Sequence, residues 1–166
     1  MHIIKAMIIA FSTYSKIPMP QFEWKEEDMQ YMLCFFPWVG AVIGVCLYLW
    51  NRFCAAFQVG RIAYVLFAEA IPILVTGGFH VDGFMDTMDA LHSYQPRERK
   101  LEILKDPHAG AFAIAGCGVY LLLYAAAFSE LRLEAFPAIG GIYVMTRALS
   151  GLSVLCFPKA RKDGLA

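Results

Sequence analysis

Long runs of hydrophobic residues, separated by short polar stretches, dominate the pattern of the chain. Four runs are almost free of charge: Tyr31–Trp50, Ile62–Phe79, Ala109–Ser129 and Ala135–Pro158. Each has 18 to 24 residues, enough for an α-helix to cross a hydrocarbon layer of roughly 30 Å. None shows the polar face that a surface helix of a soluble protein presents to water. The pattern therefore predicts an all-α, polytopic transmembrane helical bundle with about four spanning helices, rather than the buried helices of a soluble protein.

A further apolar segment, Met1–Ser15, precedes these runs. It is short and contains Lys5, and Pro18 and Pro20 follow it, so a helix here must end early. We interpret it as an interfacial or re-entrant helix, with an additional full span as the alternative. It lacks a convincing small-residue cleavage site, which argues against a signal peptide. Without repeats or linkers, the simplest organisation is one membrane domain over residues 1–166.

Charge adds an orientation to this picture. The chain is 59% hydrophobic and its formal net charge is zero, so nothing favours a nucleic-acid partner. Residues 1–30, 80–108 and 159–166 carry ten Lys and Arg, whereas the loops 51–61 and 130–134 on the other side carry three. The positive-inside rule places the richer side in the cytoplasm. We therefore expect a multi-pass protein of the cell (inner) membrane, with both termini and the acidic loop 80–108 cytoplasmic.

Three aspartates follow the second hydrophobic run. Asp82, Asp86 and Asp89 stand at positions i, i+4 and i+7, within about 60° of one helical face. Carboxylates this close repel one another, and a hard divalent cation such as Mg²⁺ relieves that repulsion. The spacing predicts that these three residues bind Mg²⁺ as a cofactor. The alternatives are a helix N-cap for Asp82 and a solvated helix face for Asp86 and Asp89.

Residues around the aspartates add to this candidate site. Gly77 and Gly78 allow the backbone to turn at the membrane surface, and Gly83 allows another group to approach Asp82. His80 is either a hydrogen-bonding anchor at the interface or a ligand of the substrate phosphate. Pro96 is typical of the first turn of a short cytoplasmic helix.

A basic stretch then leads to the third hydrophobic run. Arg99 and Lys105 are candidates for binding a substrate phosphate, and Asp106 could complete a metal shell. The alternative for this stretch is an ordinary solvated run of charges. Inside the hydrophobic runs stand only Glu69 and Arg147, and charged groups in membranes are costly and often functional. They could pair with each other, or Arg147 could bind a substrate phosphate.

At this point the sequence resembles a known family. The segment GFHVDGFMDTMD, residues 78–89, is similar to the hallmark of the cobalamin synthase family, the adenosylcobinamide-GDP ribazoletransferases, which read roughly G-[LF]-H-x-D-G-[LF]-x-D-T-x-D. The resemblance is colinear over essentially the whole chain, and further matching blocks are FSTYSKIP (11–18), FPWVG (36–40), RKLEILKD (99–106), GAF (110–112), Arg147 and ARKDGL (160–165). Two departures are Ala90, where many members have Gly, and Pro107-His108, where many have Ser-Arg.

The resemblance implies the last assembly step of the cobalamin nucleotide loop. The small-molecule partners would be adenosylcobinamide-GDP, a corrinoid nucleotide, and α-ribazole or its 5′-phosphate. The products would be adenosylcobalamin or its phosphate, with release of GMP. Mg²⁺ held by the three aspartates would bridge the diphosphate, and Asp89 or Asp106 could accept the hydroxyl proton. Lys105, Arg99, Arg147 and Arg161 would be the candidate phosphate contacts.

Family chains continue with further spans after the ARKDGL block, so we expect this chain to be a fragment or a truncated member. Other readings stay open at this stage. A membrane phosphotransferase of the CDP-alcohol type also uses spaced aspartates, but its longer D-x-x-D-G-x-x-A-R pattern is absent. A polyprenyl transferase, a cation transporter with an acidic mouth and an inactive remnant are the remaining alternatives. Membrane lipid is an expected partner, and a homo-oligomer is compatible with the sequence.

Overall fold

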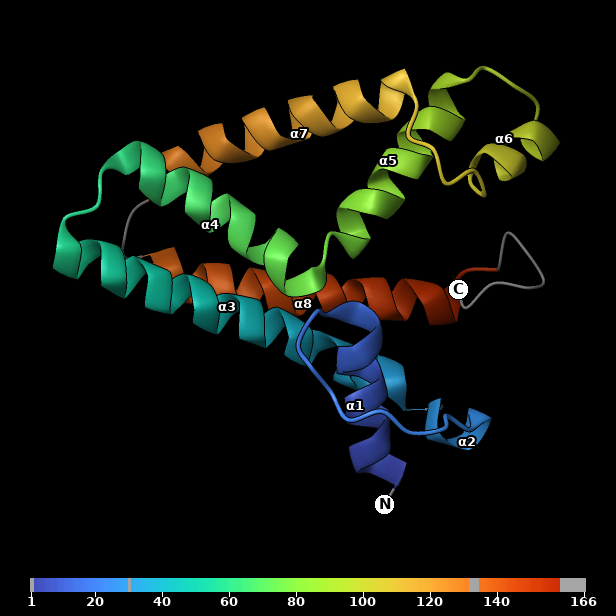
Figure 1. The fold of residues 1–166 in the computed structure, drawn as a ribbon, viewed down its shortest axis with the longest axis horizontal. Helices are drawn as coiled ribbons and strands as arrows, with labels where there is room; N and C mark the ends of the chain where they lie inside the picture. Colours follow the sequence, from blue (N-terminus) through green and yellow to red (C-terminus); the bar gives the residue numbers. More distant parts are fainter. Residues whose placement is uncertain (1, 30, 132–134, 159–166) are drawn as a thin grey trace. The chain divides into compact units, whose positions relative to one another are not determined.

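The computed structural model describes residues 2–29, 31–131 and 135–158, and these residues form helices and connecting turns without a strand. The prediction of an all-α protein is therefore confirmed for the described part of the chain. Figure 1 shows the helices in order: α1 (His2–Tyr14), α2 (Glu26–Met29), α3 (Met32–Phe57), α4 (Arg61–Thr76), α5 (Phe79–His92), α6 (Arg97–Ile103), α7 (Ala111–Ser129) and α8 (Phe136–Cys156).

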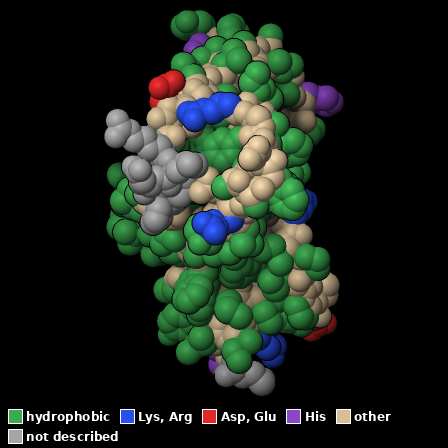
Figure 2. Space-filling model, turned by 90° about the vertical axis from the view of Figure 1, so that its left-hand side faces the viewer, with side chains coloured by type: hydrophobic (Ala, Val, Ile, Leu, Met, Phe, Trp, Pro, Cys, Tyr) green, Lys and Arg blue, Asp and Glu red, His purple; other side chains and the backbone are tan. Residues whose placement is uncertain are grey.

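Three helices among the described residues are long and apolar enough to cross a membrane: α3, α7 and the part Ala138–Cys156 of α8. A fourth candidate is the pair α4 and α5, which meets the same test only when the two are taken together, across a bend of 92°. The expectation of about four spans thus agrees with three candidate spans among the described residues, or up to four if this bent pair is one span. Figure 2 shows hydrophobic side chains covering most of the visible face, as a lipid-facing surface requires.

The first predicted span differs from the structure at its end. The helix α3 continues past Trp50 to Phe57, through residues assigned to a loop. Arg52 ends the charge-free run but not the helix, because Arg is a good helix former and the backbone bonds continue around it. The helix stops where Gln58 takes up a left-handed conformation, at φ 51°. The end of an apolar run therefore need not coincide with the end of the helix that contains it.

The described residues divide into two compact units, which are treated separately below. The first unit comprises residues 1–58 and 132–166, and the second comprises residues 59–131. The first therefore contains α1, α2, α3 and α8, and the second contains α4, α5, α6 and α7. The expectation of one domain over the whole chain stays a prediction.

In the first unit, α3 and α8 pack along each other with their backbones in contact. A Cβ atom on Gly40 would overlap the backbone carbonyl of Tyr143, and one on Gly44 would lie 2.8 Å from the Cα of Gly140. Small residues let two helices approach in this way, and the gain is close van der Waals contact along the crossing. The Gly40-x-x-x-Gly44 pattern therefore marks the contact between α3 and α8.

The N-terminal helix α1 packs against α3 and α2 in the same unit. Ile9 and Ala10 are buried with Met32, and the Tyr14 ring lies 4.2 Å from that of Phe36, centroid to centroid. This confirms a short N-terminal helix that ends before the Pro18–Pro20 segment, while its interfacial location stays a prediction.

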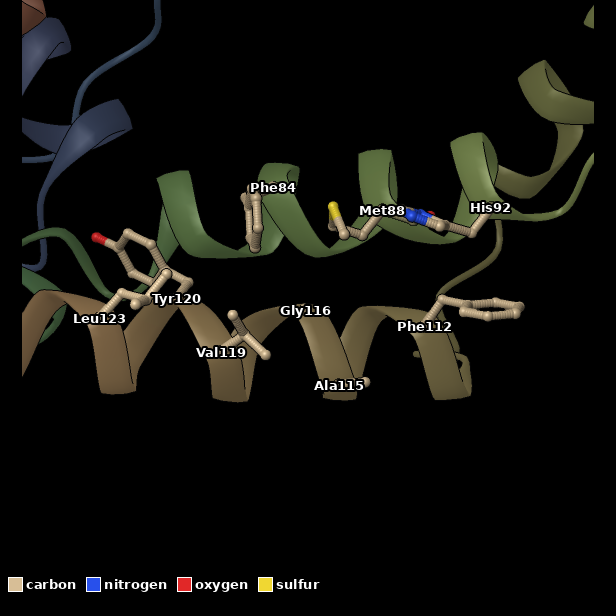
Figure 3. A pocket seen from close by; sticks show the side chains of 9 residues that line it. All are labelled: Phe84, Met88, His92, Phe112, Ala115, Gly116, Val119, Tyr120 and Leu123. Carbon is tan, nitrogen blue, oxygen red and sulfur yellow. The ribbon is translucent and has the colours of Figure 1, made fainter.

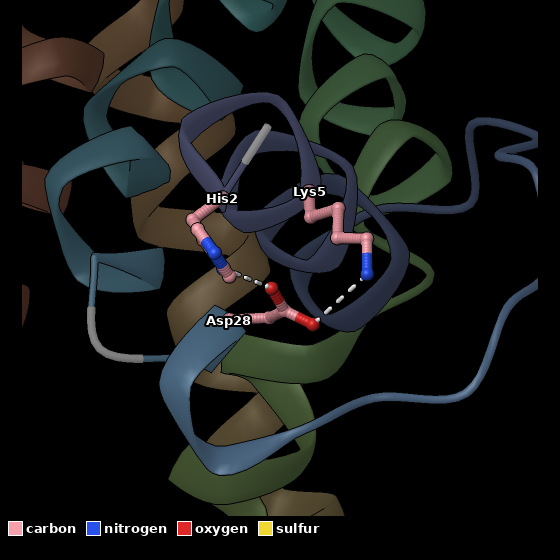
Figure 4. Close-up of polar contacts among 3 residues, drawn as sticks. All are labelled: His2, Lys5 and Asp28. Atoms are coloured by element: carbon pink, nitrogen blue, oxygen red, sulfur yellow. Dashed lines mark hydrogen bonds and ion pairs between the residues drawn. The ribbon is translucent and has the colours of Figure 1, made fainter.

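A buried carboxylate ties α2 to α1. The Asp28 side chain is 1% exposed, and it accepts hydrogen bonds from His2 Nδ1 at 2.8 Å and from Lys5 Nζ at 3.3 Å (Figure 4). A buried charge requires such partners, because burial removes its hydration. These hydrogen bonds lower the pKa of Asp28, with the one from His2 contributing most, against the opposing effect of desolvation. The carboxylate therefore stays charged and fixes the start of the chain to α2.

The second unit is organised by a sharp bend. Gly77 and Gly78 both have a left-handed backbone, at φ 67° and φ 80°, and the Gly78 amide donates to the carbonyl of Ile73 at 3.0 Å. This is the Schellman type of helix end, which favours glycine because a Cβ atom strains that conformation. The predicted turn at these glycines is confirmed. It separates α4 from α5, and α7 contacts both helices (Figure 1).

Candidate functional site

The helix α5 carries the three aspartates that the sequence singles out. It begins at Phe79, directly after the bend, and its first backbone hydrogen bond runs from the Asp82 amide to the carbonyl of Gly78 at 2.8 Å. The Asp82 side chain is exposed, and those of Asp86 and Asp89 are half-buried. The first part of the predicted acidic loop 80–108 is therefore a regular helix, and the helical spacing expected for the aspartates is confirmed.

Asp89 is engaged with the start of α7. Its Oδ2 accepts a hydrogen bond from the Gly110 amide at 2.6 Å, and its Oδ1 accepts one from the Ala113 amide at 2.8 Å. Both oxygens of this carboxylate thus face the free N–H groups at a helix N-terminus. The sequence offered Asp89 as a metal ligand, as part of a solvated helix face or as the acceptor of the hydroxyl proton, and none of these interpretations anticipates this contact.

The described residues contain no group of three or more His, Cys, Asp or Glu side chains arranged to hold a metal ion. The assignment of Asp82, Asp86 and Asp89 as Mg²⁺ ligands therefore stays a prediction. Asp82 and Asp86 remain one helical turn apart on α5, and nothing in the described chain lies within 4 Å of the Cβ position of Gly83. This part of the helix is open to a ligand that brings further oxygen atoms.

Lys105 and Asp106 lie in the turn that follows α6, and both side chains are exposed. Asp106 Oδ1 accepts hydrogen bonds from the His108 amide at 3.0 Å and from His108 Nδ1 at 2.7 Å. These bonds, the backbone one first, lower the pKa of Asp106. The residue therefore stabilises its own turn, and it belongs to no group of three potential metal ligands in the described structure.

The remaining predicted residues are spread over the molecule. Arg99 pairs with Glu102 on the surface of α6. His80 is half-buried, with its ring 5.5 Å from that of Phe79, centroid to centroid. Arg147 lies on α8 in the first unit, over the Tyr143 ring, so its pairing with Glu69 of the second unit stays a prediction. Arg161 lies outside the described residues.

An apolar groove of about 480 Å³ runs between α5 and α7 (Figure 3). Its α5 side is formed by Phe84, Met88 and His92, and its α7 side includes Phe112, Gly116 and Tyr120. At about 100° per residue, the groove-lining positions of α5 lie roughly 120° around the helix from the aspartates. The two features therefore use different sides of α5.

Comparison with known proteins gives the context of these residues. The model of the cobalamin-5-phosphate synthase family matches residues 6–166. The chain belongs to this family. The resemblance seen in the sequence is confirmed, and both the aspartate block on α5 and the block that leads into α7 lie within the match. No solved structure matches the chain.

Several relatives share the family and are named adenosylcobinamide-GDP ribazoletransferase. One from Lachnoclostridium phytofermentans is 49% identical over 98% of this chain, and this chain covers 62% of that protein. One from Listeria monocytogenes serotype 4b is 34% identical, with 98% of this chain and 66% of the relative covered. One from Clostridium perfringens strain SM101 is 30% identical, with 96% and 68% covered. The chain therefore spans about two thirds of the length of these relatives.

The partner of Asp89 is the main feature that the sequence did not reveal. Gly110 immediately precedes α7 and has no side chain to cap it. A helix that starts after such a residue needs acceptors from elsewhere. The missing capping side chain at Gly110 indicates that an acceptor comes from elsewhere. The sequence does not show that this acceptor is Asp89, because Asp89 is 21 residues away.

Proposed function

We propose that the chain acts in a membrane-bound, Mg²⁺-dependent transferase that joins adenosylcobinamide-GDP with α-ribazole or α-ribazole 5′-phosphate. The products would be adenosylcobalamin or its phosphate, together with GMP. Membership of the family supports this reaction, and the names of the relatives describe it. The observation that carries the proposal is the arrangement on α5, where exposed Asp82 and half-buried Asp86 stand one turn apart and the space around the Cβ position of Gly83 is open.

The residues present fit Mg²⁺ as part of a shared site. Mg²⁺ prefers oxygen ligands, keeps some of its water, and is often held by one or two carboxylates plus substrate phosphates. Asp82 and Asp86 supply two carboxylates, and the diphosphate of the substrate supplies the remaining anionic oxygens. When bound, Mg²⁺ neutralises charge on the diphosphate and on the departing GMP. Two carboxylates are few ligands for Mg²⁺, so this site is suited to a metal ion that binds together with the nucleotide substrate.

The bond changes define what else the protein must do. A ribazole hydroxyl oxygen forms a bond to the phosphorus that stays with the cobinamide, and the bond from that phosphorus to the oxygen of GMP breaks. The hydroxyl proton passes to a base. Asp106 is exposed enough to meet substrate, but its lowered pKa makes it a weak base. Lys105 and Arg99 lie near the same turn and are candidates for holding phosphate oxygens.

Location follows from the distribution of charge. The apolar helices are compatible with a membrane protein, and the excess of Lys and Arg around residues 80–108 supports a cytoplasmic position for α5 and α6. The nucleotide substrate and millimolar Mg²⁺ are found on that side of a cell membrane. His80, close to the bend, would then lie near the level of the lipid headgroups.

The test is release of GMP from adenosylcobinamide-GDP by membranes that contain the chain, with α-ribazole and Mg²⁺ supplied. Asp86→Asn should reduce the rate at least a hundredfold, because loss of one carboxylate removes metal-linked charge stabilisation that typically contributes several kcal/mol. Glu98→Gln on exposed α6 is the control and should retain the rate. Full activity of Asp86→Asn, or no release by the folded chain, would contradict the proposal.

A further inference from the structure

The start of α7 depends on a side chain from another helix. Gly110 is the N-cap residue, at φ −86° and ψ 176°, and it makes no side-chain cap. A helix exposes four unpaired N–H groups at this end, and a capping side chain normally accepts one or two of them. Here Asp89 of α5 accepts the amides of Gly110 and Ala113, the N-cap and N3 positions.

The match between Asp89 and this helix end is electrostatic as well as geometric. A helix N-terminus carries partial positive charge, and a carboxylate placed there is stabilised. Hydrogen bonds to an ionised acceptor are also stronger than neutral ones. The two short bonds, one to each oxygen, therefore fix the Asp89 side chain in both position and orientation, and with it the adjoining turn of α5.

Gly110 is required by this contact. A Cβ atom on residue 110 would lie 2.7 Å from Asp89 Oδ1, 2.8 Å from Oδ2 and 2.9 Å from Cγ. These distances are far below van der Waals separation, so any side chain at position 110 would push the carboxylate away. The two residues belong to separate blocks of the family resemblance, and the structure joins those blocks through this contact.

We propose that Asp89 is a positioning residue rather than a metal ligand: its contact with Gly110 and Ala113 clamps α5 to α7. The clamp holds Asp82 and Asp86 in place for the metal and the diphosphate, and this consequence rests on the function proposed above. Asp89 thus differs from the other two aspartates in the group it binds, although all three share one helix face. Its oxygens accept the amides of α7, whereas Asp82 is exposed and Asp86 is half-buried.

Gly110→Ala separates the two roles, because it displaces Asp89 without removing any carboxylate. The matched control is Gly118→Ala on the same helix, where nothing in the described structure lies within 4 Å of the new Cβ. Mn²⁺ with inorganic pyrophosphate serves as the probe, and binding to the purified chain is measured by electron paramagnetic resonance. Positioning predicts that Gly110→Ala and Asp89→Ala each weaken binding about tenfold, the usual effect of residues that orient ligands.

The combination of variants gives the decisive result. The double variant Asp89→Ala with Gly110→Ala should bind Mn²⁺ no more weakly than Asp89→Ala alone, because both changes remove the same contact. Asp89→Asn keeps one acceptor oxygen and should bind more tightly than Asp89→Ala. Loss of binding in Asp89→Ala with unchanged binding in Gly110→Ala would overturn the proposal and make Asp89 a direct ligand. Unchanged binding in both would overturn the positioning role.

Amide hydrogen exchange tests the clamp independently of metal and substrate. In the metal-free chain, Asp89→Ala should increase exchange of the Gly110 and Ala113 amides at least tenfold, with no comparable change in Gly118→Ala. Unaltered exchange in Asp89→Ala would show that the clamp is absent. If the clamp is present but the unmodified chain neither binds Mn²⁺ with pyrophosphate nor releases GMP, the function is wrong, and the positioning role fails with it.

Discussion

The two units of the molecule join their helices by different means. In the first unit, α3 and α8 meet through backbone atoms at glycines, and each is one uninterrupted helix of more than 20 residues. In the second, α4 and α5 are separated by a break of 92°, α5 is tied to α7 by one carboxylate, and an apolar groove remains between them. The first unit is thus closely packed at its helix contact, whereas the second contains a break and an unfilled groove.

This difference separates a supporting region from a candidate site. Close backbone contact leaves no room for a ligand and resists rearrangement, because packed interiors respond to small changes in volume. A break with glycines, partly exposed carboxylates and an unfilled groove has the opposite properties. Stability changes should therefore be large in the first unit, whereas changes in the second unit should act mainly on the placement of α5.

The largest effect is expected where α3 and α8 touch. Gly40→Ala places a methyl group against the carbonyl of Tyr143, so one helix must move. We expect a loss of about 3 kcal/mol in unfolding free energy, the upper part of the usual range for overpacking. Thermal unfolding of the detergent-solubilised protein measures it. Gly141→Ala, with open space around its Cβ position in the described structure, is the control.

The contrast between the units would weaken if Gly40→Ala and Gly141→Ala had the same unfolding temperature. That result would mean that α3 and α8 can separate slightly without cost, and that the first unit is as adaptable as the second. A loss of unfolding free energy in Gly40→Ala but not in Gly141→Ala would agree with a rigid packing of α3 against α8.

A smaller effect is expected at the bend of the second unit. Gly78→Ala keeps the space around residue 78 open but forces alanine to adopt φ 80°. The strain should cost about 1 kcal/mol, the lower end of the penalty for an L-residue in the left-handed region. The same unfolding measurement applies, with Gly118→Ala as reference. An unchanged midpoint would show that the break between α4 and α5 tolerates another backbone path.

The smallest effect concerns the link between α1 and α2. The pKa of Asp28 is lowered in the folded protein, so its contribution to stability is present above the unfolded pKa and is lost as pH falls through the folded one. Protonation therefore releases α1 only below about pH 4, near the ordinary Asp value. Amide exchange of α1 should increase there, and Asp28→Asn should remove this pH dependence.

Glu27→Gln is the matched control, because the neighbouring Glu27 side chain is exposed. It should leave the exchange profile of α1 unchanged. A profile that is the same in Asp28→Asn and in the unmodified chain would mean that apolar packing around Ile9 and Ala10 alone holds α1 in place.

The sequence predicted the features that depend on local pattern. Charge-free runs located the apolar helices, and Gly77 and Gly78 located the break before α5, because their preference for left-handed backbone is a property of the residue itself. The spacing of Asp82 and Asp86 correctly placed them on a helix. Pro96 indicated the start of α6 to within one residue.

Features that need distant partners were missed. The extension of α3 to Phe57 depends on hydrogen bonds that continue beyond the apolar run. The contact of Asp89 with Gly110 joins residues 21 positions apart, and periodicity gives the same angle whether a carboxylate faces metal or a helix end. The contacts of Gly40 with Tyr143 and of Gly44 with Gly140 of α8 likewise join residues far apart in the chain and required three-dimensional placement.

The contact between Asp89 and Gly110 also closes the base of a loop. The segment from Ala90 to Ala109, which includes α6, begins and ends next to this single pair of residues. A chain anchored at both ends can change in length at small entropic cost, since closure entropy grows only slowly with length. Insertions in this segment should therefore alter the surface beside α5 while leaving the aspartates of α5 undisturbed.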